Sequence, residues 1–303
     1  MLKAMLGEAW LAMGANRLRT ALTMLGMVIG VGAVVIMIAI GQGAQYAVQQ
    51  TIATMGSNLF IVLSGSFTTA GVRSGAAGAP TLNVADAEAI AELEGIVNVA
   101  PTHQGRRQLA YGSQNWNANV VGTTPPYLDA RAWSIASGAA FGDSDVRAAT
   151  RVALLGKTTA QNLFGDEDPV GKTMRIQQNP FIVIGVLGSK GQNLDGNDQD
   201  DTVIIPLTTA QRKVFGTPFL NSVRMIMVQA ESAEGMPRAM DSVTALLRQR
   251  HRLREGQPDD FFMRNLSAAA ETEAQTTRTM SILLGAIASI SLLVGGIGIM
   301  NIM

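Results

Sequence analysis

The sequence predicts a membrane protein of the α+β class, in which two transmembrane helices flank an external domain with a split α+β subdomain and an inserted β-rich subdomain. No charged residue lies between Thr20 and Val72, and none between Thr279 and Met303. The stretch from Arg73 to Arg278 carries 42 of the 46 charges in this 303-residue chain. A near-normal soluble domain between two uncharged apolar segments excludes a simple cytosolic enzyme as the default interpretation.

The first apolar segment is long enough to cross a bilayer. Leu22 to Ile40 contains 19 residues without a charge, and a helix needs about 20 apolar residues to cross the hydrocarbon core. We assign residues 20–45 to this transmembrane helix. A buried core helix would normally show a polar stripe, and a signal peptide has a shorter apolar stretch and a cleavage site.

The second apolar segment, residues 279–303, is predicted as a second transmembrane helix that is truncated. Ser281 to Met303 is again uncharged, and the sequence stops inside it without a polar or aromatic flank. We therefore expect a fragment of a longer membrane protein. The alternative is a protein that ends in a tail anchor.

Basic residues beside the first span predict its orientation. Lys3, Arg17 and Arg19 precede it, whereas no Lys or Arg follows until Arg73. The positive-inside rule places the N-terminus in the cytoplasm and the large domain, residues 46–278, outside. Residues 1–19 have helical apolar spacing, and we interpret them as an interfacial helix with Trp10 at headgroup depth among the membrane lipids. The alternative is a simple upstream extension of the span. Trp10, Arg17 and Arg19 would mark the membrane boundary.

Glycines in both spans are candidates for helix packing. Gly26 and Gly30 form a G-x-x-x-G pair in the first span, and Gly295, Gly296 and Gly298 gather in the second. Small residues let helix backbones approach closely. Glycine is common in membrane helices, so this pattern alone is a weak signal.

The external domain predicts two α–β clusters separated by an insertion. We expect residues 46–126 and 201–278 to form one subdomain and residues 127–200 to form the insertion. Asn83 or Thr81 is expected to cap the first helix, and Thr208 a later short one. The predicted helices are 84–95, 208–215 and 233–252, and the predicted strands are 57–63, 96–99, 107–111, 116–121, 202–207, 222–229 and 260–264.

Two glycine-rich runs resemble phosphate-binding loops without meeting the requirements of one. Five residues separate Gly165 from Gly171, whereas the motif needs four, and three acids between them would repel phosphate. Arg151 stands where the glycine upstream of Gly156-Lys157-Thr158 is required. We predict no nucleotide site in this chain and interpret Asp166 to Lys172 as a structural turn.

The remaining polar clusters do not predict an enzyme. Asp195, Asp198, Asp200 and Asp201 fail the calcium-loop pattern and are interpreted as a solvated hairpin loop. His103 and His251 are isolated and the chain has no cysteine, so we predict no metal site and no cofactor. The arginines at the end of the last predicted helix, Arg248, Arg250, Arg252 and Arg254, are interpreted as a solvated face rather than a nucleic-acid patch. No nucleophile signature is present.

Four strings resemble one known family. NRLRTALTMLGMVIGVGAVVIM (16–37) resembles the first transmembrane helix of MacB-type ABC transporter permeases, and SLLVGGIGIMNIM (291–303) the start of their second. RVALLGKTTAQNLFGDEDPVGKTMRIQQNPFIVIGVL (151–187) and DDTVIIPLTTAQRKVFG (200–216) are similar to that family's periplasmic core domain. The four follow the family's order from one end of the chain to the other.

The resemblance implies an inner-membrane permease of four helices, with a periplasmic domain between the first two. That domain would divide into a porter-like α+β subdomain and an inserted subdomain. Family members dimerise and are driven by a cytoplasmic ATPase. ATP-driven closure is transmitted mechanically to the periplasmic domains, which push substrate onward, often through an adaptor and an outer-membrane channel. The implied partners are therefore an ABC ATPase subunit, a second permease copy or a paralogue, and those export components.

Two departures and one alternative accompany this resemblance. In the macrolide exporter of the family the ATPase is fused upstream, whereas the first span here begins at residue 20, so we expect the ATPase on a separate chain. Helices three and four are absent from the sequence. A membrane sensor with a periplasmic ligand-binding domain has the same span–domain–span layout and is the alternative function.

Overall fold

A computed structural model describes residues 58–65, 81–193, 196–216 and 221–266, together with helical positions between Met24 and Tyr46 and between Gln275 and Ile290. The chain separates into two units. The first comprises Met1–Gln50 and Glu271–Met303, and the second comprises Thr51–Ala270. Each unit is described by itself.

In the first unit, every described residue is helical. Most of the large apolar side chains described there are exposed, with Val28 at 68 % and Ile290 at 63 % of their full accessibility. Among the described residues, no helix combines the length and the apolar character needed to cross a membrane.

The second unit is built on a large mixed sheet. Its main path runs in the order β12-β1-β11-β3-β4-β9-β6-β8-β5, while β7 pairs with β3 and β8, and β10 pairs with β2. The strands are β1 (Leu59–Ser64), β2 (Leu82–Asn83), β3 (Ile96–Tyr111), β4 (Gln114–Thr123), β5 (Ile135–Gly138), β6 (Val152–Leu155), β7 (Thr173–Ile176), β8 (Asn179–Leu187), β9 (Thr202–Pro206), β10 (Ser222–Val223), β11 (Met225–Ala230) and β12 (Phe261–Asn265).

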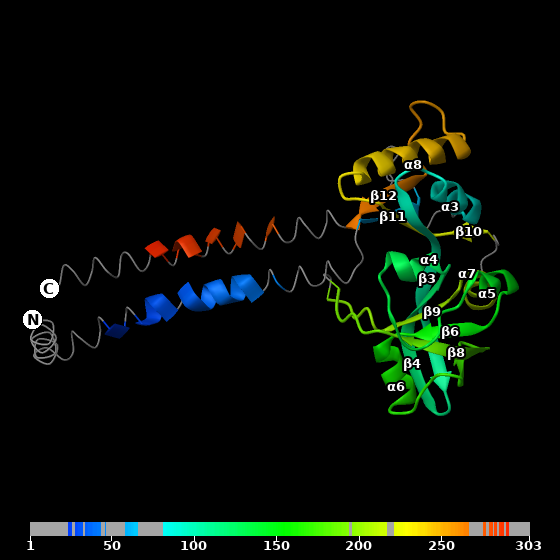
Figure 1. Cartoon of the computed structure of the whole chain (residues 1–303), viewed down its shortest axis with the longest axis horizontal. Helices are drawn as coiled ribbons and strands as arrows, with labels where there is room; N and C mark the ends of the chain where they lie inside the picture. Colours follow the sequence, from blue (N-terminus) through cyan, green and yellow to red (C-terminus); the bar gives the residue numbers. More distant parts are fainter. Residues whose placement is uncertain are drawn as a thin grey trace, which may run out of the picture. The chain divides into compact units, whose positions relative to one another are not determined.

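Short helices cover the sheet at both ends of this unit. In Figure 1, α3 and α8 lie at one end, where β11 and β12 run, and α6 lies at the other end beside β4. The helices are α3 (Val84–Ala91), α4 (Pro126–Ala130), α5 (Asp143–Ala148), α6 (Lys157–Phe164), α7 (Leu207–Thr209), the π-helix η1 (Ala210–Phe215) and α8 (Met236–Arg250).

Strand β3 is one continuous strand, so the prediction of two separate strands at 96–99 and 107–111 was wrong. It pairs with β11 as far as Thr102, which lies opposite Met225. From His103, opposite Gly122, it pairs with β4. Two different neighbours therefore sustain one strand, and such a change of partner leaves no signature in the local sequence pattern. At about 3.3 Å per residue, its 16 residues span about 50 Å.

Three buried clusters form the core of this unit. The first lies among β1, β11, α3 and α8, and includes Phe60, Ile90 and Leu247. The second lies among β4, β6, β8, β9 and α6, and includes Leu163 and Phe181. The third contains residues of β1, β6 and β9 with the α4 region. The predicted boundaries at 126/127 and 200/201 stay a prediction.

The helix after β9 differs from its prediction. Thr208 was expected to cap it, but α7 begins at Leu207 without a side-chain cap and continues as the π-helix η1. The Thr208 hydroxyl instead donates to the backbone carbonyl of Val146. The Thr208 hydroxyl therefore joins this helix to the α5 region. Pro206, which has no backbone N–H to donate, precedes the first turn.

Candidate functional site

The residues predicted for helix packing and for the membrane boundary lie almost entirely outside the described part of the chain. Of the packing glycines, only Gly30 is described, and it is helical and half-buried. The others, which are outside the described residues, are Gly26, Gly295, Gly296, Gly298, Trp10, Arg17 and Arg19. Their proposed roles stay predictions.

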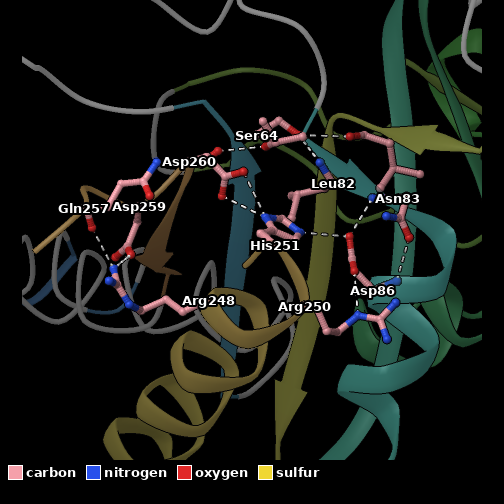
Figure 2. Close-up of polar contacts among 12 residues, drawn as sticks. Ser64, Leu82, Asn83, Asp86, Arg248, Arg250, His251, Gln257, Asp259 and Asp260 are labelled. Atoms are coloured by element: carbon pink, nitrogen blue, oxygen red, sulfur yellow. Dashed lines mark hydrogen bonds and ion pairs between the residues drawn. The ribbon is translucent and has the colours of Figure 1, made fainter. Parts of the chain in front are cut away.

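A charged cluster, which we call the Asp86 cluster (Asp86, Arg250, His251 and Asp260), closes one end of the sheet (Figure 2). Asp86 lies in the first turn of α3, Arg250 ends α8, His251 caps it, and Asp260 precedes β12. The end of α8 and the start of β12, which are close in the sequence, therefore meet the distant start of α3 through side chains that carry opposite charges.

Asp86 is held in place by the local sequence of α3. Asn83 is the N-cap, its side chain accepts from the Asp86 amide at 2.9 Å, and Asp86 accepts from the Asn83 amide at 3.0 Å. This capping box confirms the predicted Asn83 cap. The carboxylate is only 1 % exposed and also accepts from Arg250 Nε at 2.7 Å. Burial of this charge is tolerated because every side of it meets a donor.

His251 lies between two carboxylates, as Figure 2 shows. Its Nδ1 is 2.8 Å from Asp260 Oδ1, and its Nε2 is 3.2 Å from Asp86 Oδ2. A neutral imidazole carries only one N–H, whereas both ring nitrogens here face acceptors. The geometry therefore favours the doubly protonated imidazolium. The prediction that His251 is isolated was wrong, because its partners are 9 and 165 residues away in the sequence.

The surroundings of His251 act on its pKa in opposite directions. Burial lowers the pKa, but the hydrogen bonds and charges of Asp260 and Asp86 outweigh burial and raise it above the ordinary value of 6.5. Arg250, on the same helix, faces Asp86 rather than the imidazole. Two carboxylates and two cations therefore balance each other in this cluster.

The raised pKa predicts a pH-dependent stability. Because the folded state binds the proton more tightly than the unfolded state, the contribution of His251 is fully present below pH 6.5 and is lost as pH rises through its folded-state pKa. We expect urea unfolding of the wild type to show this loss above pH 6.5, and a His251→Gln variant to lack it. His103, with a pKa lowered to about 4, acts below pH 6.5 and is common to both proteins. Parallel pH profiles above pH 6.5 would contradict the prediction.

The Asp86 cluster also joins the backbone segments around it. The Asp260 carbonyl accepts from the Thr81 hydroxyl at 2.7 Å and from the Gly65 amide at 3.0 Å. Ser64 Oγ accepts from the Leu82 amide at 3.2 Å. The end of β1, the start of β2 and the start of β12 are thus fixed to one another beside the cluster.

The arginines at the end of α8 are only partly a solvated face. Arg248 forms an ion pair with Asp259 and donates to the carbonyls of Gln257 and Arg254. Arg250 forms the ion pair with Asp86. The interpretation of these two as solvated was wrong because the chain returns over the helix end and supplies acids that the linear pattern does not show.

The interpretation of the acidic run near residue 200 as a solvated loop holds for Asp198, which is exposed, but was wrong for Asp200, which is buried, and for Asp201, which is half-buried. Asp200 is 3 % exposed and accepts from Ser189 Oγ and from the amides of Lys190 and Gly191. Asp201 accepts from Trp116 Nε1 at 2.6 Å and forms an ion pair with Arg106. Saturation by donors makes their burial favourable. Asp195 lies outside the described residues.

The contacts in these clusters are of the kind that hold chain segments together rather than carry out a reaction. Among the described residues, no group of three or more His, Asp or Glu side chains has the arrangement of a metal site. The Gly165–Gly171 run is a turn, as predicted, with Gly165 and Gly171 both at positive φ and Lys172 paired with Glu167. Elsewhere among the described residues, four buried side-chain nitrogens have no hydrogen-bond partner: His103 Nδ1, Arg107 Nε, Arg131 Nε and Gln199 Nε2.

Comparisons with known proteins agree on one family. A family model described as the MacB-like periplasmic core domain matches residues 20–246. The macrolide export ATP-binding/permease protein MacB of Rhodospirillum rubrum is 43 % identical over 95 % of this chain and 43 % of its own length. The pyoverdine export ATP-binding/permease protein PvdT of Pseudomonas aeruginosa is 37 % identical over 97 % of this chain and 42 % of its own length. The chain thus spans less than half of these curated relatives.

A solved structure matches the second unit. The periplasmic region of MacB from Actinobacillus actinomycetemcomitans superimposes with a TM-score of 0.58 and 25 % identity, over 75 % of this chain and 95 % of that one. That region was crystallised by itself. The three buried clusters found among the described residues also lie within residues 51–270, so this unit has a hydrophobic core of its own.

Proposed function

Since the chain belongs to the family of the MacB-like periplasmic core domain, we propose that it is a permease subunit of an ABC-type export system. In this proposal, residues 20–45 and 279–303 cross the inner membrane, the N-terminus is cytoplasmic, and residues 46–278 are periplasmic. A cytoplasmic ATPase on a partner chain drives the permease. It acts as a homodimer or with a paralogue, and passes substrate towards a periplasmic adaptor and an outer-membrane channel.

The observation that supports mechanical transmission is the pairing of β1 with β12. β1 is the first strand after the proposed first span, and β12 is the last strand before the second. They are antiparallel neighbours, with Phe60 opposite Asn265. The two connections to the membrane segments therefore leave from adjacent strands at the same edge. A shift of either connection would load the same strand pair directly.

Strand β3 offers a route from this pair to the rest of the unit. β11 pairs with β1 on one side and with β3 on the other. β3 then continues past Thr102 into the half of the sheet formed by β4, β9 and β6. A backbone displacement at the membrane-linked strands can thus reach the far half through one covalently continuous strand.

The described helical positions of the first unit are compatible with lipid-facing segments. Most of their large apolar side chains are exposed, and an exposed apolar helix surface of this kind needs lipid or a partner helix to cover it. Gly26, Gly30 and the three glycines of the second segment are the proposed contact points between helices.

The test uses the absence of cysteine from the sequence. A Ser144→Cys variant places one thiol on exposed α5, and a spin label there reports one distance between two copies. In the full-length permease copurified with its ATPase and reconstituted in liposomes, we expect ATP with vanadate to change that distance distribution. Label access from the periplasmic side serves as the topology control. An unchanged distribution during ATP turnover would rule out mechanotransmission, and ATPase activity of the isolated permease would contradict the proposed division of labour.

A further inference from the structure

A group of side chains that takes no part in the clusters described above lies where β3 changes its pairing partner from β11 to β4. Thr102 is the last residue paired with β11, and His103 is the first paired with β4. Because side chains alternate along a strand, His103, Gly105 and Arg107 share one face of β3. We call this group, together with Arg224 and Phe215, the waist site.

The aromatic ring of Phe215 covers the waist site. Phe215 is the last residue of η1, and its ring centroid lies 4.5 Å from that of His103 and 4.6 Å from Arg107 Cζ. A Cβ on Gly105 would lie 3.2 Å from Phe215 Cε1, so the ring rests directly on this glycine. An aromatic ring thus covers a buried histidine and stacks over part of a half-buried arginine.

Two polar atoms beneath this ring lack partners. His103 is 6 % exposed, and neither its Nδ1 nor Arg107 Nε has a hydrogen-bond partner. One guanidinium nitrogen of Arg107 already has a partner, since Nη1 donates to the Arg106 carbonyl at 2.8 Å. Orphaned buried polar atoms are rare in native structures and costly, so two of them at one ring indicate a missing hydrogen-bond partner, which for Arg107 Nε–H is an acceptor.

The electrostatics of the waist site favour an anion. Arg107 and Arg224 lie close enough to His103 that, after burial itself, their charges lower its pKa to about 4. Among the described residues, neither arginine forms an ion pair, whereas Arg106, on the opposite face of β3, pairs with Asp201. Positive charge therefore accumulates on this face without a carboxylate to balance it.

The helix that carries Phe215 has an unusual conformation. η1 is a π-helix, a rare conformation that recurs at functional sites, and its last residue, Phe215, is followed by Gly216, which has a φ of +58°. A rotation of the Phe215 side chain away from Gly105 would uncover Arg107 Nε and His103 Nδ1 together.

We propose that the waist site binds a carboxylate, which accepts from the guanidinium edge of Arg107 and from His103 when Phe215 rotates aside. Side-on pairing of one carboxylate with an arginine is the strongest and most specific arrangement of these two groups. A single guanidinium beneath the Phe215 ring suits a monoanion, because a phosphate dianion would lose more hydration when it enters the site. The proposal does not depend on the export function.

The test titrates the Thr51–Ala270 unit with three probes: acetate, inorganic phosphate and an acetylated tetraglutamate amide. The Nε–H resonance of Arg107 in ¹H–¹⁵N spectra reports contact directly. We expect saturable movement of this resonance with a carboxylate probe, and a rise in the pKa of His103 as its positive surroundings are neutralised. Tighter binding of the peptide than of acetate identifies an acidic side chain of a partner as the source, and equal binding identifies a small carboxylic acid.

Matched variants separate a site from general charge attraction. Arg107→Lys keeps the charge but removes Nε, so binding to this variant is followed by the imidazole resonances of His103, and we expect it to weaken at least about tenfold. Arg175→Lys is the control, because Arg175 is exposed on β7 of the same sheet. Equal weakening by both variants overturns the proposal, as does binding of phosphate alone. The absence of a saturable shift with all three probes also overturns it.

Discussion

Replacing Asp86 with alanine is expected to lower the free energy of unfolding of the Thr51–Ala270 unit by about 3–5 kcal/mol, the range found when one partner of a buried ion pair is removed. The carboxylate is 1 % exposed and accepts from Arg250, His251 and the Asn83 amide. Its loss leaves each of these donors facing a void, and it removes half of the capping box of α3.

The measurement is urea unfolding near pH 6, where His251 is protonated. Glu88→Ala is the matched control, because Glu88 is an exposed acid on the same helix, and its effect should stay within about 0.5 kcal/mol. Asp86→Asn should fall between the two, since an amide oxygen still accepts from the Asn83 amide but pairs poorly with two cations. A loss for Asp86→Ala no larger than that for Glu88→Ala would show that the cluster is not a stabilising contact.

The Asp86 cluster also shows where sequence reasoning stops. The Asn83–Asp86 capping box lies within four residues, and a cap was predicted at Asn83 or Thr81, because capping chemistry is local. The pairing of Asp86 with Arg250 joins residues 164 positions apart. Only the packing of α3 against α8 brings them together, and no local pattern carries that information. The arginine run was accordingly interpreted as solvated.

Elements whose signal is local were predicted well. The amphipathic helix predicted at 233–252 corresponds to α8, with bounds shifted by a few residues. The strand predicted at 222–229 is a strand over most of its length, but it breaks at Arg224 into β10 and β11, which pair with different strands. β3 was divided in the prediction because its continuity depends on two different neighbouring strands. The π-helix η1 was likewise not predicted, because its widened turn arises from tertiary contacts and not from the propensity of AQRKVF.

The acids around residue 200 illustrate the same limit in energetic terms. From the sequence, four acids in seven residues read as a solvated loop, since burial of unpaired charge is costly. The cost is removed by donors that the fold supplies: the amides of Lys190 and Gly191 for Asp200, and Trp116 for Asp201. The composition indicates that burial of these carboxylates would be costly, and only the structure shows that hydrogen-bond donors offset this cost.

The second large effect is expected at the partner change of β3. Gly122 lies opposite His103, and a Cβ built on it would be 2.0 Å from the Cβ of Ala210, the first residue of η1. Real Cβ contacts essentially never fall below 3.0 Å, and both residues belong to packed backbone elements. Gly122→Ala should therefore force η1 away from β4 and lower the free energy of unfolding by about 3 kcal/mol, the upper part of the range for overpacking.

A second substitution distinguishes this clash from a general intolerance of β4 to change. Ala210→Gly removes the atom that the new methyl group meets, at a cost of about 1 kcal/mol for glycine in a helix. If the contact is the cause, the double variant is more stable than the sum of the two single effects predicts, with a coupling of about 1–3 kcal/mol in a double-mutant cycle measured by urea unfolding. Additive losses would mean that Gly122 is required for its backbone conformation and not for the space it leaves. Because η1 also carries Phe215, the single variant should expose the Arg107 Nε–H to solvent exchange, and the double variant should protect it again.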